Sequence, residues 1–287
     1  MNLQDIALQV LVVAMMVSIG LDLEPRALRE LGQQRGAFVK GLLFNTIAFP
    51  ATTFAATELF DLSPAISAGL MLCAVAPGGP TGPVFARLAG GHLAFATALM
   101  VALSALGLFT IPASAGLLAG SDVDASSSFG PMLQTLALYQ LAPLALAMLF
   151  RSRFAGVASR LARPARVLSN VALLAVIVGL LAARGALLLE VPLSTHLILI
   201  GLLLIFLAPG LRPGATPTQR ASSQVTSVRN LSIALLLCAR FFPDPRTEVS
   251  ILAWGFWMML LPGLAAVWAG RRSTRSSTTT GAPEPRR

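Results

Sequence analysis

Residues 69–91 contain the first groups that could bind a ligand. Pro77, Pro80 and Pro83, with the glycines between them, interrupt a stretch that is otherwise apolar. Proline removes a backbone donor and glycine permits left-handed turns, so part of the backbone over 76–84 is expected to lack helical hydrogen bonds. Lipid cannot satisfy such groups, and broken helices of this kind form binding sites in membrane transporters. The sequence therefore predicts a ligand-binding break at this point.

Arg229 is the second candidate, because it lies near the middle of a segment bounded by Arg220 and Arg240. A central arginine costs about 2.5–3.5 kcal/mol on membrane-insertion scales, so its side chain should face the protein interior and meet partners there. One interpretation is a structural cation bonded to backbone carbonyls or hydroxyls. The other is a substrate contact, since a guanidinium offers a rigid fork of donors that fits a carboxylate. The two are compatible, because a structural cation can bind a carboxylate when the substrate enters.

The predicted binding site combines both interruptions with one amide from the preceding span. The segment 218–242 is polar in its first half and apolar in its second, and it contains no glycine or proline, so its interruption is inferred from polarity alone. We expect the half-helix ends to converge on one cavity, where amino-terminal ends favour anions and carbonyl ends favour cations. The predicted substrate- or ion-binding residues are Asn45, Gly79, Pro80, Thr81, Gly82, Ser223, Gln224, Thr226, Arg229 and Asn230.

Other chemistry has little support in the sequence. His196, with Ser194 or Thr195, is the only cluster that could supply a nucleophile and a base. His92 and His196 are the only histidines, and neither has a neighbouring cysteine or histidine, so no metal site is predicted. The sequence also lacks a Walker loop and a G-x-S-x-G element. We therefore predict neither an enzyme activity nor a cofactor.

The composition is that of a polytopic membrane protein. Hydrophobic residues make up 55% of the 287 residues, charged residues make up 11%, and the mean hydropathy is +0.77. These values are typical of a chain dissolved mostly in lipid. A helical span needs about 20 apolar residues. The nine predicted transmembrane helices are 3–21, 36–58, 63–90, 92–119, 131–150, 165–184, 192–210, 218–242 and 247–269.

Basic residues set the predicted orientation. An outside N-terminus and nine spans place most of the 21 lysine and arginine residues on the cytoplasmic side, as the positive-inside rule requires. The formal charge of +9 therefore reflects topology and gives no reason to expect nucleic-acid binding. Residues 1–270 are expected to form a single transmembrane domain in the plasma or inner membrane. Residues 271–287 are polar and are expected to form a disordered cytoplasmic tail.

Four elements of the sequence, in order, resemble those of the bile acid:sodium symporter family. Residues 20–25, GLDLEP, are similar to the family's G-L-x-L-x-P. The second span carries Asn45 and Pro50 where the family has glutamine and proline. Residues 77–92 are similar to its P-G-G-T-A-S-N and L-A-x-G-N element, and residues 226–234, TSVRNLSIA, to V-G-M-Q-N-S-G-L-A. The resemblance covers nearly the whole chain.

The resemblance implies an all-α, inverted-repeat transporter with two crossing broken helices, which moves organic anions by alternating access. Family members with ten spans have an extra first helix, so this chain corresponds to the last nine. A core domain would consist of about 36–119 and 192–269, beside a panel domain of about 3–21 and 131–184. The implied partners are a small organic anion and the lipid bilayer. The sequence predicts neither the identity of the anion nor an oligomeric state.

The departures from the family concern its sodium ligands. At most of the matching positions this sequence has residues without side-chain oxygens: Gly82, Pro83, Ala96, Met100 and Val225. Asn45 keeps an amide, and the ligand glutamine of the second crossing helix falls on Arg229. A sodium ion beside a guanidinium in a low-dielectric site would be repelled by several kcal/mol. We therefore expect Arg229 to replace the ion, and we do not expect sodium coupling of the family's kind.

The sequence favours a secondary carrier for a small organic anion, working as a uniporter or with protons. One alternative is a receptor or assembly protein that kept the fold and lost transport, which the missing ion ligands favour. A second alternative is an intramembrane enzyme built on His196. Substrate-dependent flux separates a carrier from a receptor, and product formation separates both from an enzyme.

Overall fold

The computed structural model describes residues 3–22, 34–114, 125–242 and 244–279, and within them the regular elements are helices, with no strand. The all-α prediction is therefore confirmed for these residues. The α-helices and the two π-helical segments, η2 and η4, are α1 (Leu3–Asp22), α3 (Arg35–Leu43), η2 (Phe44–Ala48), α4 (Phe49–Leu59), α5 (Pro64–Val75), α6 (Gly82–Leu88), α7 (Leu93–Ala113), α8 (Ala125–Leu136), η4 (Ala137–Leu141), α9 (Ala142–Arg153), α10 (Ala155–Leu188), α11 (Leu193–Leu211), α12 (Pro217–Ser227), α13 (Leu231–Phe241) and α14 (Pro245–Thr279).

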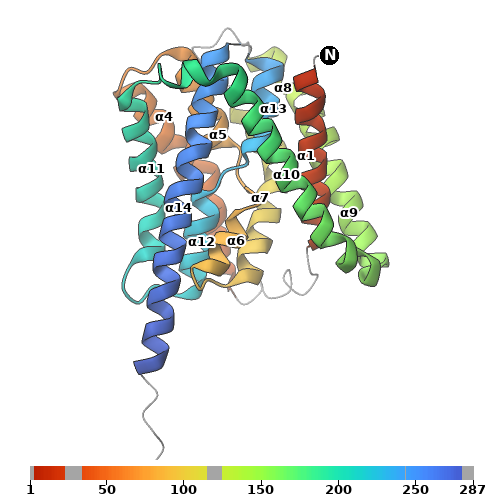
Figure 1. The fold of residues 1–287 in the computed structure, drawn as a ribbon, viewed down its shortest axis with the longest axis vertical. Helices are drawn as coiled ribbons and strands as arrows, with labels where there is room; N and C mark the ends of the chain where they lie inside the picture. Colours follow the sequence, from red (N-terminus) through yellow and green to blue (C-terminus); the bar gives the residue numbers. More distant parts are fainter. Residues whose placement is uncertain (1–2, 23–33, 115–124, 243, 280–287) are drawn as a thin grey trace, which may run out of the picture.

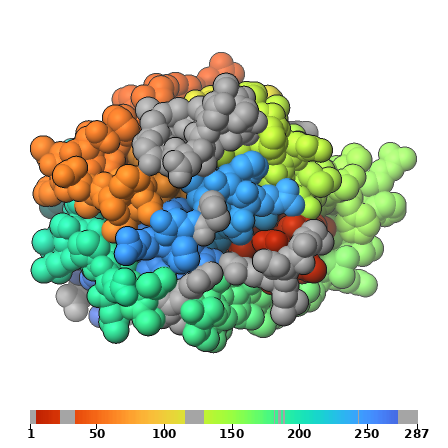
Figure 2. Space-filling view, turned by 90° about the horizontal axis from the view of Figure 1, so that it is seen from above, coloured from red at the N-terminus to blue at the C-terminus, as the bar shows by residue number. Residues whose placement is uncertain are grey.

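Most of the helices run side by side along the long axis of the molecule (Figure 1). On one side α1 packs against α9 and α10, and on the other α14 packs against α5 and α11. The N-terminal end of α1 and the free end of α14 lie at opposite ends of the molecule (Figure 1). Figure 2 looks onto the end where α1 begins and shows the blue segment of α13 and early α14 between α4–α5 and α8–η4.

Six described helical segments are long and apolar enough to cross a membrane: Asp5–Asp22, Leu93–Ala113, Phe129–Arg153, Ala155–Leu180, Leu193–Leu211 and Pro245–Arg272. Of the other three predicted spans, two are interrupted by non-helical residues, and the one at 36–58 is a continuous helix with a π turn. They correspond to α3–η2–α4, α5–α6 and α12–α13. α5, for example, has 12 residues, which rise about 18 Å and fall short of a hydrocarbon core of about 30 Å. The prediction of nine transmembrane helices is therefore only partly supported and stays a prediction.

Some helix ends differ from the predicted bounds. α10 begins at Ala155, earlier than the predicted start at 165. α14 continues to Thr279, so residues 271–279 are helical where the sequence predicted a disordered tail. One reason is that the Arg272 guanidinium lies 3.7 Å from the ring centroid of Trp268, one helical turn earlier. Residues 23–25, 115–119 and 280–287 of the predicted motif, span and tail lie outside the described residues.

Two π-helical segments each place an amide side chain in the interior. η2 contains the buried Asn45 and is followed by Pro50, and η4 contains the buried Gln140 and is followed by Pro143. Proline cannot donate to the helical ladder, and a local π turn is one way in which membrane helices accommodate it. π turns are frequent at functional sites. The turn at Asn45 brings that residue to the centre of the fold.

We expect Gly69→Ala to destabilise the fold, because α5 and α14 approach closely at Gly69. A Cβ atom there would overlap Ser250 Oγ and lie 2.5 Å from the Thr247 carbonyl oxygen. Overpacking of this kind usually lowers the free energy of unfolding by about 1–3 kcal/mol. Thermal unfolding of the purified protein in detergent measures the effect. Gly201→Ala is the control, because a Cβ at Gly201 meets nothing within 4 Å, and equal melting temperatures would contradict the expectation.

Candidate functional site

The two interrupted helices meet at their breaks. The first break lies between α5 and α6, and the second lies between α12 and α13. The backbone N–H of Gly79 donates to the carbonyl of Val228 (3.3 Å), and that of Asn230 donates to the carbonyl of Ala76 (2.8 Å). Each break therefore satisfies backbone groups that the other leaves unpaired. The second interruption is present although its segment contains no glycine or proline.

Glycine at 78 and 79 allows this close approach. Gly78 has φ +82°, which glycine adopts without a steric penalty. A Cβ atom at Gly79 would overlap the carbonyl oxygen of Arg229 and lie 2.8 Å from Val228 Cγ1. A larger residue at Gly79 would therefore push the two breaks apart.

The Arg229 side chain fills the space beside this crossing and is only 1% exposed. A guanidinium has five N–H donors, and here every one has an oxygen acceptor. The Nε atom donates to the Cys73 carbonyl at 3.2 Å. Nη1 donates to Asn45 Oδ1 (2.8 Å) and to the Thr226 carbonyl (3.5 Å). Nη2 donates to the carbonyls of Asn45 (3.2 Å) and Ala74.

The acceptors around Arg229 are neutral. The Cys73 and Ala74 carbonyls belong to the last turn of α5, and the Thr226 carbonyl belongs to the last turn of α12. Carbonyl ends of helices carry partial negative charge and stabilise cations. The Phe49 ring adds a cation–π contact, with its centroid 4.5 Å from Cζ. This geometry favours the structural-cation interpretation, because a substrate carboxylate would have to displace one of these acceptors.

Asn45 links Arg229 to the second break. Its Nδ2 atom donates to the Gly41 carbonyl (2.8 Å) and to Thr226 Oγ1 (2.9 Å), while Oδ1 accepts from Arg229. Because both the amide and the guanidinium are buried, loss of either side chain would leave one buried polar atom of the other unpaired. The structure thus brings together three of the predicted site residues.

The other predicted residues take different positions. Pro80 and Thr81 face cavities described below, and Gly82 packs against Val225. Asn230 caps α13, because its Oδ1 atom accepts from the Ile233 backbone N–H.

Ser223 belongs to a different contact, since it packs against Gly210 of α11. Gln224 Oε1, Ser227 Oγ and Asn230 Nδ2 are buried atoms that have no hydrogen-bond partner within the described part of the chain. Ser223 is therefore separated from the crossing, whereas Gln224 and Asn230 keep unused bonding capacity near it.

Two adjoining cavities lie beside the crossing. The first, the basic cavity, has a volume of about 400 Å³ and lies between α1, α10, α6, α7 and the first break. Its polar lining consists of Ser18, Asp22, Thr81, Arg87, Thr97, Arg166, Ser169 and Asn170. The second, the apolar cavity, has a volume of about 290 Å³ and is lined mainly by leucine, isoleucine and methionine of α1, α10, α13 and α14, with Arg229 at its edge. Both share Met15, Pro80, Thr81 and Asn170.

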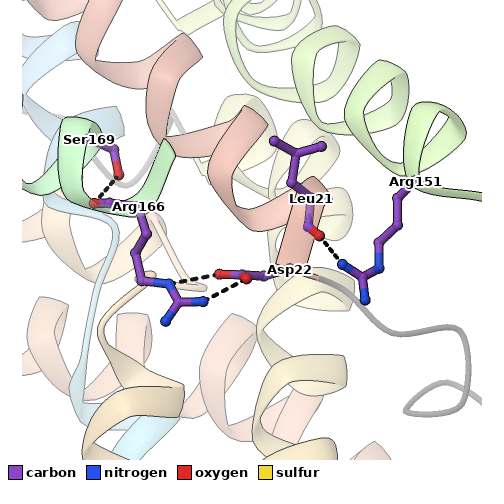
Figure 3. A network of polar contacts seen from close by, with 5 residues as sticks. All are labelled: Leu21, Asp22, Arg151, Arg166 and Ser169. Carbon is purple, nitrogen blue, oxygen red and sulfur yellow. Dashed lines mark hydrogen bonds and ion pairs between the residues drawn. The ribbon is translucent and has the colours of Figure 1, made fainter. Parts of the chain in front are cut away.

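An ion pair lies at the wall of the basic cavity (Figure 3). The Arg166 guanidinium on α10 donates to both carboxylate oxygens of Asp22 at the end of α1, from Nε at 2.9 Å and from Nη2 at 2.6 Å. Ser169 Oγ donates to the Arg166 carbonyl (3.0 Å), and Arg151 of α9 donates to the Leu21 carbonyl. These contacts join α1, α9 and α10 at one end of the molecule.

The sequence did not identify Asp22, Arg87 or Arg166 as site residues. Asp22 and Arg166 are separated by 144 positions, so only the packing of α1 on α10 brings them together. Arg87 resembles an ordinary interfacial cation in the sequence. The one available signal was the position of Asp22 in the GLDLEP element.

The family profile of the sodium bile acid symporters matches residues 9–191. The chain belongs to the sodium bile acid symporter family. This confirms the resemblance noted in the sequence. The match includes most of α1, the first broken helix and all of α10, whereas Arg229 and the second broken helix lie outside it. No curated protein matched the chain.

The histidine considered for catalysis, His196, does not line either cavity. The His196 Nδ1 atom accepts from Trp257 Nε1 at 3.0 Å, which joins α11 to α14. Among the described residues no group of three or more histidine, cysteine, aspartate or glutamate side chains could hold a metal ion. Sodium bile acid symporters are transporters, which is consistent with the predicted lack of enzyme activity.

We expect Arg229→Leu to unfold at a markedly lower temperature than the wild type. Five oxygen acceptors would lose their donor, and a buried acceptor left unpaired costs about 1–3 kcal/mol. Arg229→Lys should also be destabilised, because an ammonium has three donors and lacks the planar fork. Differential scanning fluorimetry in detergent measures both variants. Arg220→Leu, which alters one 3.4 Å hydrogen bond from the adjoining helix α12, is the control, and a melting temperature for Arg229→Leu equal to that of Arg220→Leu would contradict the structural role.

Proposed function

We propose that this sodium bile acid symporter relative is a secondary transporter that moves a small organic anion by alternating access. The observation that carries the proposal is the position of the two adjoining cavities beside the crossing of the broken helices. α1 and α10 form one wall, and the first break, α6, α7, α13 and α14 form the other. Alternating access requires such a pathway between two groups of helices, because one group rocks against the other.

The lining of the pathway suits an organic anion. Arg87 and Arg166 supply positive charge in the basic cavity. Leu173, Ile177 and Met258 supply apolar surface in the adjoining cavity. A few polar groups next to an apolar wall are the usual design of a small-molecule site. A substrate with one charged end and one apolar end would match both parts.

At the end of the molecule where α1 begins, hydrogen bonds join α13 to α8, η4 and α1. Arg240 of α13 donates to Thr135 Oγ1 (3.1 Å) and to the Tyr139 hydroxyl (3.3 Å). The Tyr139 hydroxyl in turn donates to Gln9 Oε1 of α1 at 3.1 Å. These hydrogen bonds lie near the end where α1 begins, whereas Asp22 of the basic cavity is at the other end of α1. We infer that these contacts between the two groups of helices change during alternating access.

The proposal includes the predicted topology. We infer nine spans, counting α3–η2–α4, α5–α6 and α12–α13 as one each, with an inverted repeat and with α1, α8–η4–α9 and α10 as the panel. Basic residues in the last turns of α6 and α9 and near the free end of α14 favour a cytoplasmic location for that end. The N-terminus is then outside and the C-terminus inside a plasma or inner membrane.

We further propose that transport proceeds without a bound sodium ion. The Arg229 guanidinium occupies oxygen acceptors from α5, η2 and α12, where a cation would otherwise be coordinated. A second cation in the same low-dielectric space would be repelled. The protein therefore carries its own cation at the crossing.

Flux measurements in proteoliposomes test the proposed function. We expect purified wild-type protein to take up at least one member of a panel of radiolabelled mono- and dicarboxylates, above protein-free liposomes. Replacing sodium by potassium on both sides should change the rate by less than about twofold, because no sodium site is used. Steep sodium dependence with Arg229 intact would contradict the proposal that transport proceeds without a bound sodium ion. Saturable binding without flux would favour the receptor alternative, and a chemically altered product would favour an enzyme.

A further inference from the structure

We propose that Arg87 and Arg166 together bind the carboxylate of the substrate, and that Asp22 makes the site selective for monoanions by neutralising one of the two guanidiniums. This inference rests on the proposed function and names the charge of the substrate. It also places the substrate's anionic end in the basic cavity, away from Arg229.

The three charged side chains come from both walls of the pathway. Arg87 is in the last turn of α6, on the side of the broken helix, whereas Arg166 on α10 and Asp22 on α1 lie on the opposite wall. A ligand in this cavity therefore meets a guanidinium on each side. A carboxylate has two oxygens, so it can accept hydrogen bonds from both.

Arg166 keeps donors for a ligand while it is paired with Asp22. The pair uses one N–H of Nε and one of Nη2, and a guanidinium has five. In Figure 3 the third guanidinium nitrogen points away from Asp22. The Arg166 side chain is 52% exposed, so these donors are open to a molecule in the cavity. Substrate binding thus does not require the ion pair to break.

Arg229 is unsuited to the same task. Its five N–H groups are already used by Cys73, Ala74, Thr226 and two oxygens of Asn45. Although it borders the apolar cavity, only 1% of the residue is exposed. The substrate carboxylate therefore needs hydrogen-bond donors other than Arg229. Arg87 and Arg166 are the arginines that line the adjoining basic cavity.

The charge of the cavity lining then selects the substrate. Arg87, Arg166 and Asp22 are its charged members, which gives a net charge of +1. A bound monoanion makes the site neutral, whereas a dianion leaves an uncompensated negative charge in a partly desolvated place, which is unfavourable. The hydrocarbon part of a monocarboxylate can extend past Pro80 and Asn170 into the apolar cavity.

Three six-carbon probes test this assignment: hexanoate, the dianion adipate and the uncharged hexanamide. Binding is measured by isothermal titration calorimetry on the full-length protein in phosphatidylcholine nanodiscs at neutral pH. We expect the wild type to bind hexanoate more tightly than adipate and to bind hexanamide weakly. Arg87→Gln and Arg166→Gln should each weaken hexanoate binding about tenfold or more, the loss expected for a hydrogen bond to a charged group.

Asp22→Asn gives a sharper test than the arginine variants, because its affinity for the carboxylate probes should rise above that of the wild type. The cavity would then carry two positive charges, and the preference should shift from hexanoate toward adipate by about tenfold. Asp22→Asn/Arg166→Gln returns the lining to a net charge of +1, so it should again favour hexanoate, with reduced affinity. If Asp22→Asn acted only by disturbing the structure, adding Arg166→Gln would not restore the preference for hexanoate over adipate.

Arg160→Gln is the matched control, because Arg160 is an exposed arginine of the same helix and does not line the cavity. Its affinities should equal those of the wild type. The inference is overturned if Arg87→Gln and Arg166→Gln behave like Arg160→Gln, if Asp22→Asn leaves the hexanoate-to-adipate ratio unchanged, or if the wild type binds neither carboxylate. The proposed function fails on different grounds, namely when no anion of the flux panel is transported.

Discussion

A buried guanidinium surrounded by neutral oxygens holds the centre of this fold together. Arg229 joins the second break to the end of α5 and to the π turn at Asn45, so three segments far apart in the sequence depend on one side chain. Partial charges at the carbonyl ends of α5 and α12 compensate its charge. Such an arrangement has little tolerance for change, because each acceptor is buried and each donor is used.

The fold separates the cation that builds the crossing from the cations that face the pathway. Backbone hydrogen bonds and the absence of a side chain at Gly79 hold the two breaks together, and Arg229 fills the space next to them. Arg87 and Arg166 line a cavity beside the crossing. Rigid positioning and reversible binding place opposite demands on a guanidinium, so the proposed substrate contacts, Arg87 and Arg166, are different residues from Arg229.

Much of the framework could be predicted from local chemistry. The prolines and glycines near Gly79 predicted the first break, and the cost of burying a charge predicted that Arg229 lies inside the protein. The structure also contains a second break where the sequence offered only a change in polarity, because the pairing of Asn230 with Ala76 is a tertiary contact. The Asp22–Arg166 pair and the π turn at Asn45 depend on how separate helices pack and where the helical register shifts. Residue types alone do not encode either feature.

The Arg229 guanidinium is covalently attached to the chain and cannot cross the membrane with the substrate. A carrier that moves a monoanion with no accompanying cation transfers one negative charge in every cycle. The membrane potential then adds about 2.3 kcal/mol per charge for each 100 mV. In a cell with a negative interior this energy would drive the anion outward, so the proposed transport of a monoanion without a co-transported cation would favour export.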